Sequence, residues 1–258
     1  MLRWRCLGSG SEGNALVIEA RAGRFVTRVL VDNGFGPRVL ARRLAQAALS
    51  VDDLDAVFVT HEHADHASGV ATLLKRRRLA LLCSRGTRTA AGLEAPEIDW
   101  RPLVDGQVLE IGELRLRPFA VPHDAAEPLQ LVASDGDRRF GLLTDIGAAT
   151  PEVVRALDGA HALQLECNHD LDLLTNGAYP GFLKRRIAGD TGHLSNAQAA
   201  ALLAAIDRTY LHTVAAAHLS RSNNRPLLAQ QALQSLCGGA LERVLVATQD
   251  DGLDWVDV

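Results

Sequence analysis

The segment 60–66, with the sequence THEHADH, is the part of the chain best suited to binding metal ions. On an extended chain, side chains two residues apart point the same way, so His61, His63 and Asp65 can converge on one side. His66 follows where an apolar helical pattern begins, which lets it face a neighbouring point. Imidazole and carboxylate ligands without cysteine suit Zn²⁺, Mn²⁺ or Fe²⁺ and argue against a closed structural zinc site. A histidine-rich surface loop is the alternative interpretation, and the position of this segment between an apolar run and a helix disfavours it.

Short apolar runs precede this segment and three other residues that could act as acid, base or ligand. Such runs, bounded by glycine or charge, are typical of buried strands. They lie at 56–60 before His61, 139–144 before Asp145, 162–165 before Glu166 and 214–217 before His218. Two more runs, at 15–18 and 29–31, predict strands in the first third of the chain.

Helix-start signals alternate with these runs. Pro37, Pro151 and Pro226 each suit the first turn of a helix. Ser195, with Gln198 three residues later, forms a capping box ahead of an alanine- and leucine-rich run. Strands that alternate with helices predict an α/β (α+β) protein in which helices cover two sheets.

The composition is that of a soluble globular protein, with 47% hydrophobic and 22% charged residues. No linker or low-complexity tract interrupts the sequence, so we expect a single domain over residues 1–258. No run approaches the roughly 20 apolar residues that span a bilayer, and the opening segment lacks a signal-peptide core. We therefore expect a cytoplasmic protein with no membrane partner. The scattered cysteines form no CxxC pair and predict buried or half-buried free thiols at Cys6, Cys83, Cys167 and Cys237.

The net charge of −4 gives the chain no global attraction to nucleic acid. A polyanionic partner must therefore meet a local patch or bound cations. The basic run at 184–186 lies close in sequence to the candidate site residues and is a candidate for touching phosphates. A solvated charge run explains it equally well.

The motif THEHADH resembles the signature of the metallo-β-lactamase superfamily, whose fold is a four-layer αββα sandwich with the metals at one edge between the sheets. The later ligands of that family have counterparts in suitable contexts: His123 in VPHD, Asp145 in LLTDIG and His218 in AHLS. The resemblance implies that Asp145 bridges two divalent metal ions. It divides the remaining ligands into His61, His63 and His123 on one metal, and Asp65, His66 and His218 on the other. Asp32 in VLVDNG matches an early aspartate that supports the ligand loop.

Four further motifs indicate a subgroup within this superfamily. CLGSGSEGN at 6–14, LECNHD at 165–170, GHLSN at 192–196 and AHLSRSNN at 217–224 together resemble the YycJ/WalJ subgroup, which is linked to DNA exonuclease activity. The pairing of GHLS with a later AHLS is also similar to tRNA 3′-processing ribonucleases of this fold. That similarity implies that His193, paired with Glu166, assists phosphodiester cleavage.

The expected function is a dinuclear metal-dependent phosphodiesterase acting on DNA or RNA. Two cations a few ångströms apart would lower the pKa of a water and supply hydroxide near neutral pH. His193, oriented by Glu166, would protonate the leaving oxygen, and Asp65 completes the set expected to act in catalysis. His193 as a helix-start residue is the structural alternative. A hydrolase of small esters, thioesters or lactams and a non-catalytic metal-binding protein are the alternative functions. For Asn168 and His169, a structural role near the metals is at least as well supported as substrate contact.

Overall fold

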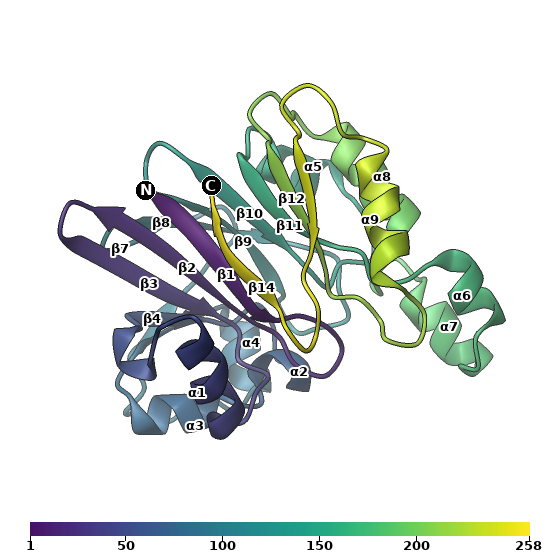
Figure 1. Ribbon diagram of the computed structural model, residues 1–258. Coiled ribbons are helices and arrows are strands. Elements are labelled where there is room, and N and C mark those ends of the chain that lie inside the picture. The colour runs from purple at the N-terminus through teal and green to yellow at the C-terminus, as the bar shows by residue number, and fades with distance from the viewer.

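Two seven-stranded mixed sheets form the centre of the protein in the computed structural model, which describes residues 1–258 (Figure 1). The first sheet has the order β14 (Leu253–Asp257), β1 (Leu2–Gly8), β2 (Ala15–Ala22), β3 (Phe25–Val31), β4 (Ala56–Phe58), β5 (Ala80–Cys83) and β6 (Trp100–Pro102). The second has the order β13 (Arg243–Val246), β12 (Thr213–Ala217), β11 (Ala162–Glu166), β10 (Arg139–Leu143), β9 (Leu129–Ser134), β8 (Leu114–Ala120) and β7 (Leu109–Ile111). In each sheet four neighbouring strands are parallel, β3 to β6 and β10 to β13, and the other pairings are antiparallel.

The inner faces of the two sheets share one hydrophobic core. Alternate residues of a strand point to opposite faces, so Leu16 and Ile18 of β2 face inward while Val17 belongs to an outer cluster. Trp4 of the first sheet stacks on Phe140 of the second with ring centroids 4.5 Å apart. Strands covered on both faces, such as β4 and β5, are apolar at every residue, which explains the continuous apolar runs in the sequence.

Helices cover the outer face of each sheet. They are α1 (Pro37–Gln46), α2 (Ala64–Ala67), α3 (Val70–Arg76) and α4 (Arg85–Ala90) in the first half, with a 3₁₀ turn at Val51–Asp53, and α5 (Pro151–Leu157), α8 (Asn196–Ala205) and α9 (Pro226–Gln234) in the second. Leu40 of α1 packs in one cluster with Leu30 of β3, and Leu202 of α8 packs in another with Leu163 of β11. The predicted four-layer αββα sandwich is therefore confirmed. None of the helices is long and apolar enough to cross a bilayer.

Four helices begin where the sequence predicted a helix start. Pro37, Pro151 and Pro226 are each the first residue of their helix, and Ser195 and Gln198 form the reciprocal capping box. All four cysteines are free thiols, as predicted, but only Cys6, Cys83 and Cys167 are buried; Cys237, after α9, is exposed.

The strand that leads to the THEHADH segment is shorter than predicted. β4 ends at Phe58 because the amide of Thr60 turns to bond the carboxylate of Asp32 rather than a neighbouring strand. Asp65 lies in the one-turn helix α2 instead of on extended chain. Its side chain therefore reaches the site from a helical turn and not through strand alternation.

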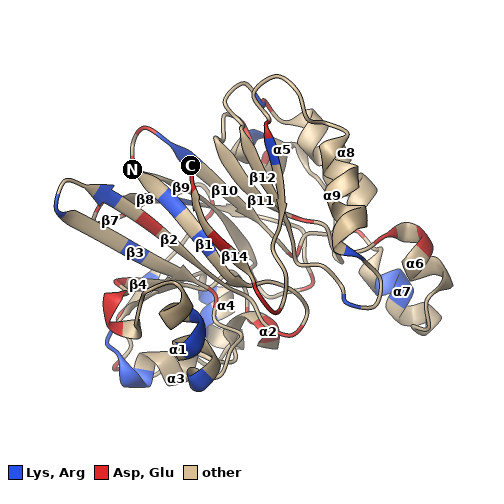
Figure 2. Cartoon of the chain, in the orientation of Figure 1, with Lys and Arg blue, Asp and Glu red and all other residues tan.

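Helices α6 (Leu171–Asn176) and α7 (Gly181–Ile187) form a projecting pair, called the α6–α7 hairpin below (Figure 1). Leu174 is its only buried helical residue, so the hairpin contributes little to the core. The Lys184 ammonium donates to the carbonyl of Thr175 (2.7 Å) and ties the two helices together. Figure 2 shows acidic residues on α6 and basic residues on α7.

Candidate metal centre

Asp32 anchors the ligand loop that follows β4. It lies just after β3 in the left-handed backbone region (φ 58°), and its Oδ1 accepts the Thr60 amide at 2.8 Å. Its Oδ2 faces Nδ1 of His66 at 2.8 Å, so the other ring nitrogen of His66 points to the site. Such outer carboxylates fix the ring orientation of metal-binding histidines. Asp145 and His218 also have positive φ (both 54°), a strained conformation that persists where surrounding structure fixes it.

Residues of two loops form hydrogen bonds with the backbone of α2. The amide of Asn14 donates to the Asp65 carbonyl (2.7 Å), and the amide of Asn33 donates to the His66 carbonyl (2.7 Å). Gly34 passes so close that a Cβ there would lie 1.8 Å from the Asp65 carbonyl oxygen, which only glycine allows. The motifs at 6–14 and 32–34 therefore hold Asp65 and His66 in place.

The first cluster joins His61, His63 and His123, with candidate ligand atoms within 4.8 Å of one another. His61 Nδ1 lies 3.0 Å from the hydroxyl of Thr60, and its Nε2 is buried without a hydrogen-bond partner. His123 Nδ1 donates to the carbonyl of Gly192 (3.1 Å), which leaves Nε2 facing His63 Nδ1 at 3.3 Å. Three imidazoles thus turn free ring nitrogens towards one point.

The second cluster joins Asp65, His66 and His218, again with candidate ligand atoms within 4.8 Å. His218 Nε2 lies 3.4 Å from Asp65 Oδ2, and His66 Nε2 lies 3.3 Å from the same oxygen. The side-chain amide of Asn14 lies 3.0 Å from His66 Nε2, a contact that the sequence reasoning missed although Asn14 ends one of the quoted motifs.

Asp145 lies between the two clusters. Its Oδ2 is 3.0 Å from His66 Nε2, and its Oδ1 is 3.5 Å from His218 Nε2 and 4.0 Å from His123 Nε2. Burial raises the pKa of this carboxyl, but His218 and His66 outweigh it and hold the pKa well below its usual value. One ionised carboxylate therefore faces both clusters.

Two buried atoms test whether metal ions fit this arrangement. His61 Nε2 and Asp145 Oδ2 are inaccessible to solvent and have no hydrogen bond of acceptable geometry. Leaving such groups unsatisfied is costly, and buried polar atoms in proteins are seldom left so. A divalent cation beside each would satisfy both, and nitrogen and carboxylate donors are what Zn²⁺, Mn²⁺ and Fe²⁺ accept. The residues present are consistent with a metal site.

Glu166, the last residue of β11, is a fully buried hub that accepts five hydrogen bonds. The donors are the amides of Asp145 (3.2 Å), Ile146 (3.1 Å) and Leu194 (3.1 Å), and Nδ1 of His193 (2.9 Å) and His218 (3.1 Å). Burial raises the pKa of Glu166, but His193 and the imidazole hydrogen bonds outweigh it and hold the pKa at about 2. The sequence reasoning paired Glu166 with His193 alone and missed its contact with His218.

His193 lies on the open side of this hub. Its Nδ1 is committed to Glu166, and its side chain is 23% exposed, so Nε2 is the nitrogen left for a molecule in the cleft. Burial lowers the pKa of His193, but Glu166 and Asp145 outweigh it and raise the pKa above its usual value.

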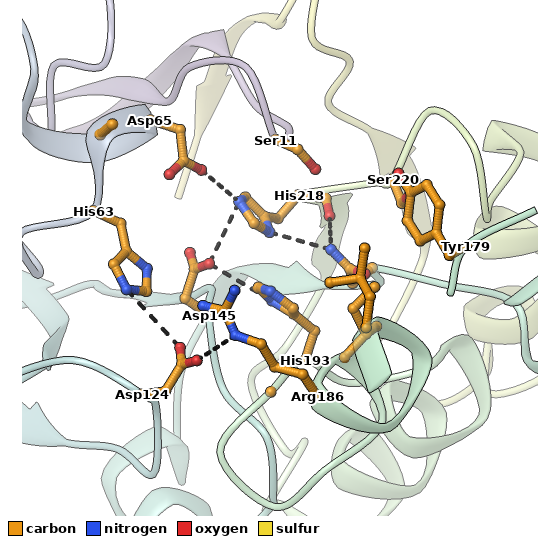
Figure 3. Close-up of a pocket in the computed structure, with 15 residues that line it drawn as sticks. Ser11, His63, Asp65, Asp124, Asp145, Tyr179, Arg186, His193, His218 and Ser220 are labelled. Carbon is orange, nitrogen blue, oxygen red and sulfur yellow. Dashed lines mark hydrogen bonds and ion pairs between the residues drawn. The ribbon is translucent and has the colours of Figure 1, made fainter. Parts of the chain in front are cut away.

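A cleft of about 390 Å³ opens over the two clusters (Figure 3). One wall carries His63 and Asp65, the floor carries Asp145, His193 and His218, and the α6–α7 hairpin supplies Tyr179, Leu183, Arg186 and Ile187. Arg186 Nε donates to Asp124 Oδ2 (2.6 Å), and Asp124 Oδ1 is 3.5 Å from His123 Nε2.

Two residues of the LECNHD motif have different surroundings. Asn168 lines the cleft, and its side-chain amide donates to the His218 carbonyl (3.0 Å). His169 is fully buried, does not line the cleft, and has no partner on either ring nitrogen. Burial lowers its pKa to about 4, so it is a neutral interior side chain at neutral pH.

Comparison with known proteins agrees with this geometry. Residues 27–214 match the family model described as the beta-lactamase superfamily domain. The chain belongs to the metallo-β-lactamase superfamily. It is 32% identical to exodeoxyribonuclease YycJ of Bacillus anthracis over 238 residues, 91% of this chain and 89% of that protein. It is 30% identical to exodeoxyribonuclease WalJ of Streptococcus pneumoniae over 236 residues, 90% of this chain and 86% of that protein. The predicted YycJ/WalJ-like subgroup is thereby confirmed.

The fold is also similar to that of a solved structure. The metallo-β-lactamase fold protein YhfI from Bacillus subtilis superposes with a TM-score of 0.75 at 15% identity, covering 100% of both chains.

Proposed function

We propose that this member of the superfamily is a dinuclear metal-dependent phosphodiesterase that degrades DNA as an exonuclease. The names of the YycJ and WalJ relatives support the activity, and both relatives align over about nine-tenths of the chain. The observation that carries the proposal is the His193–Glu166 pair beside the two ligand clusters.

The pair suits a phosphodiester because its leaving group is an alkoxide, which departs readily only when protonated. His193 presents Nε2 to the cleft while Glu166 holds Nδ1 at 2.9 Å and favours the charged ring. In this role His193 donates a proton from Nε2 to the leaving oxygen, a contribution of about 10²–10⁴ in rate. Glu166 acts as a positioning residue because it is buried behind the imidazole.

We propose His61, His63 and His123 as ligands of one divalent ion, Asp65, His66 and His218 as ligands of the other, and Asp145 as the shared ligand. Zn²⁺ or Mn²⁺ fits this donor set best, and Fe²⁺ is compatible with it. Such a pair supplies Lewis acidity towards a phosphate and lowers the pKa of water. We also propose that residues 1–258 form one domain, because the core between the sheets draws on both halves of the chain.

The alternative functions differ in what they require of His193. A thioester releases a thiolate, which is a far weaker base than an alkoxide, so a proton donor contributes little to its hydrolysis. A non-catalytic metal protein needs neither His193 nor its orientation by Glu166. The partly exposed, oriented imidazole therefore favours phosphodiester cleavage over both.

The test combines metal analysis with a panel of substrates. The metal-loaded protein is assayed on bis-p-nitrophenyl phosphate, a thioester and nitrocefin, and then on 5′- and 3′-labelled single- and double-stranded DNA and RNA. We expect turnover of the phosphodiester and stepwise shortening of DNA. Turnover of the thioester or nitrocefin alone would assign the protein to small-molecule hydrolysis. No turnover at full metal loading would leave the non-catalytic role.

A further inference from the structure

The α6–α7 hairpin forms a wall of the cleft that the proposed chemistry does not use. Tyr179, Leu183, Arg186 and Ile187 all face the cleft, although the hairpin itself is mostly exposed. Aromatic residues make up only 4% of the sequence, and one of its two tyrosines lies here. A scarce aromatic side chain beside a metal centre points to a ligand that it contacts.

The three basic residues of α7 have different partners. Lys184 donates to the Thr175 carbonyl within the hairpin, and Arg185 does not line the cleft. Arg186 reaches over the cleft, where Asp124 holds its Nε at 2.6 Å beside the first ligand cluster (Figure 3). Of the basic run at 184–186, only Arg186 is therefore placed to meet a phosphate in the cleft.

Tyr179 lies at the other end of the cleft. Figure 3 shows its ring beside Ser220, on the His218 side, whereas Arg186 lies on the side of His63 and Asp124. The acid candidate His193 lies between these two ends in this view, and it lines the same cleft. A ligand that spans the cleft thus meets an aromatic side chain at one end and a guanidinium at the other.

We infer that the α6–α7 hairpin binds the terminal nucleotide of a DNA strand: Tyr179 stacks on the terminal base and Arg186 binds a phosphate of the same strand. The inference rests on the proposed phosphodiesterase function and adds how the end of the substrate is bound. The terminal base of a strand has one face that no neighbouring base covers, whether or not that base is paired, and base–aromatic stacking is tolerant of sequence. The cleft volume of about 390 Å³ lies near the lower end of pockets that hold small ligands, which suits the end of a strand better than the interior of a duplex.

Charge supports the same assignment. A chain of net charge −4 repels a polyanion at long range, so a phosphate must be attracted locally. Arg186 is 60% exposed at the side chain and offers nitrogens that its single contact with Asp124 leaves free. Its planar guanidinium suits a phosphate better than an ammonium does.

The first experiment measures kcat/KM on a single-stranded oligonucleotide with a normal terminal nucleotide and on one whose terminal nucleotide is abasic. Tyr179→Ala is expected to lower kcat/KM on the normal strand by about tenfold or more, the usual effect of removing a stacking partner. The same variant should equal the wild type on the abasic strand. Tyr179→Phe should restore the activity, because it keeps the ring. Phe182→Ala, which removes an exposed aromatic of the same hairpin that does not line the cleft, is the matched control.

The second experiment compares Arg186→Gln with Arg185→Gln across a range of salt concentrations. Each phosphate contact to a single strand contributes about −0.7 to the slope of log affinity against log salt. Arg186→Gln should therefore make the slope of kcat/KM shallower by about 0.7, and Arg185→Gln should leave it unchanged.

The outcomes separate this inference from the proposed function. Equal losses for Tyr179→Ala on normal and abasic strands, or equal slopes for the two arginine variants, overturn the hairpin's role while the wild type still cleaves DNA. A preference of the wild type for RNA over DNA overturns the inferred substrate. Failure of the wild type to cleave any phosphodiester overturns the proposed function itself.

Discussion

Replacing His193 with alanine is expected to slow cleavage of an unactivated DNA phosphodiester by about 10²–10⁴-fold. That range corresponds to about 2.7–5.4 kcal/mol of lost transition-state stabilisation. The lost group is the cleft-facing imidazole whose Nδ1 is held by Glu166 at 2.9 Å; it lies within reach of Asp145 and His218, but we do not propose it as a metal ligand. After the substitution, Glu166 still accepts from His218 and three backbone amides, so the ligand clusters should keep their places. The loss should therefore be in kcat, with metal content unchanged.

Two leaving groups provide the assay. A DNA strand releases an alkoxide that needs a proton, whereas bis-p-nitrophenyl phosphate releases p-nitrophenolate, which needs little help. His193→Ala should thus lose far less activity on the nitrophenyl ester than on DNA. His212→Ala, which removes a half-buried histidine bonded to Thr213 outside the cleft, is the control for losing a histidine. An equal loss on both substrates would refute proton donation by His193 and leave substrate positioning as its role.

Three further changes probe the hub, the shared ligand and the fold. Glu166→Gln should weaken metal binding by about 10–100-fold in a metal titration and also slow DNA cleavage, because the carboxylate orients His218 as well as His193; unchanged metal affinity would show that the His218 contact is dispensable. Asp145→Ala should lower metal content and abolish turnover of every substrate alike, as metal analysis and the substrate panel would reveal. Glu19→Gln should lower the unfolding free energy by about 1–3 kcal/mol in urea at neutral pH, because this buried carboxylate binds three arginines of the first sheet. Burial raises the pKa of Glu19, but the hydrogen bonds from the arginines outweigh it and lower the pKa. The contribution of Glu19 to the unfolding free energy is therefore full above about pH 4.3 and is lost as the pH falls. The difference in unfolding free energy between variant and wild type should accordingly disappear in acid.

The parts of the fold that the sequence could predict are those set by local pattern. The runs before Asp145 and His218 are strands buried on both faces, so their apolar continuity is visible in the sequence. The capping box at Ser195 depends only on residues three apart. The end of β4 could not be predicted in this way, because a carboxylate 28 positions away, that of Asp32, captures the Thr60 amide.

In the candidate site, too, the sequence predicted some residues and missed others. Motif and resemblance together named the residues of both ligand clusters, which the structure brings within 4.8 Å in each set. They did not reveal Asn14 beside His66, or the ion pair between Arg186 and Asp124, which are 62 positions apart. Tyr179 carries no signal of its own, since only the path of the hairpin brings it to the cleft. Contacts of this kind depend on how distant loops meet, which no local spacing encodes.

Glu166 explains how the candidate metal centre can keep its geometry independently of the α6–α7 hairpin. One carboxylate holds His193 and His218 at 2.9 and 3.1 Å, so the proposed proton donor and a proposed metal ligand share a single reference point. Their rings stack with centroids 5.4 Å apart, and the amides of Asp145 and Leu194 bind the same carboxylate. The hairpin lies in the chain between Glu166 and His193, yet these bonds fix both of its ends. Its cleft-facing side chains can therefore change without moving the centre, so substrate choice can vary through the hairpin while the chemistry stays the same.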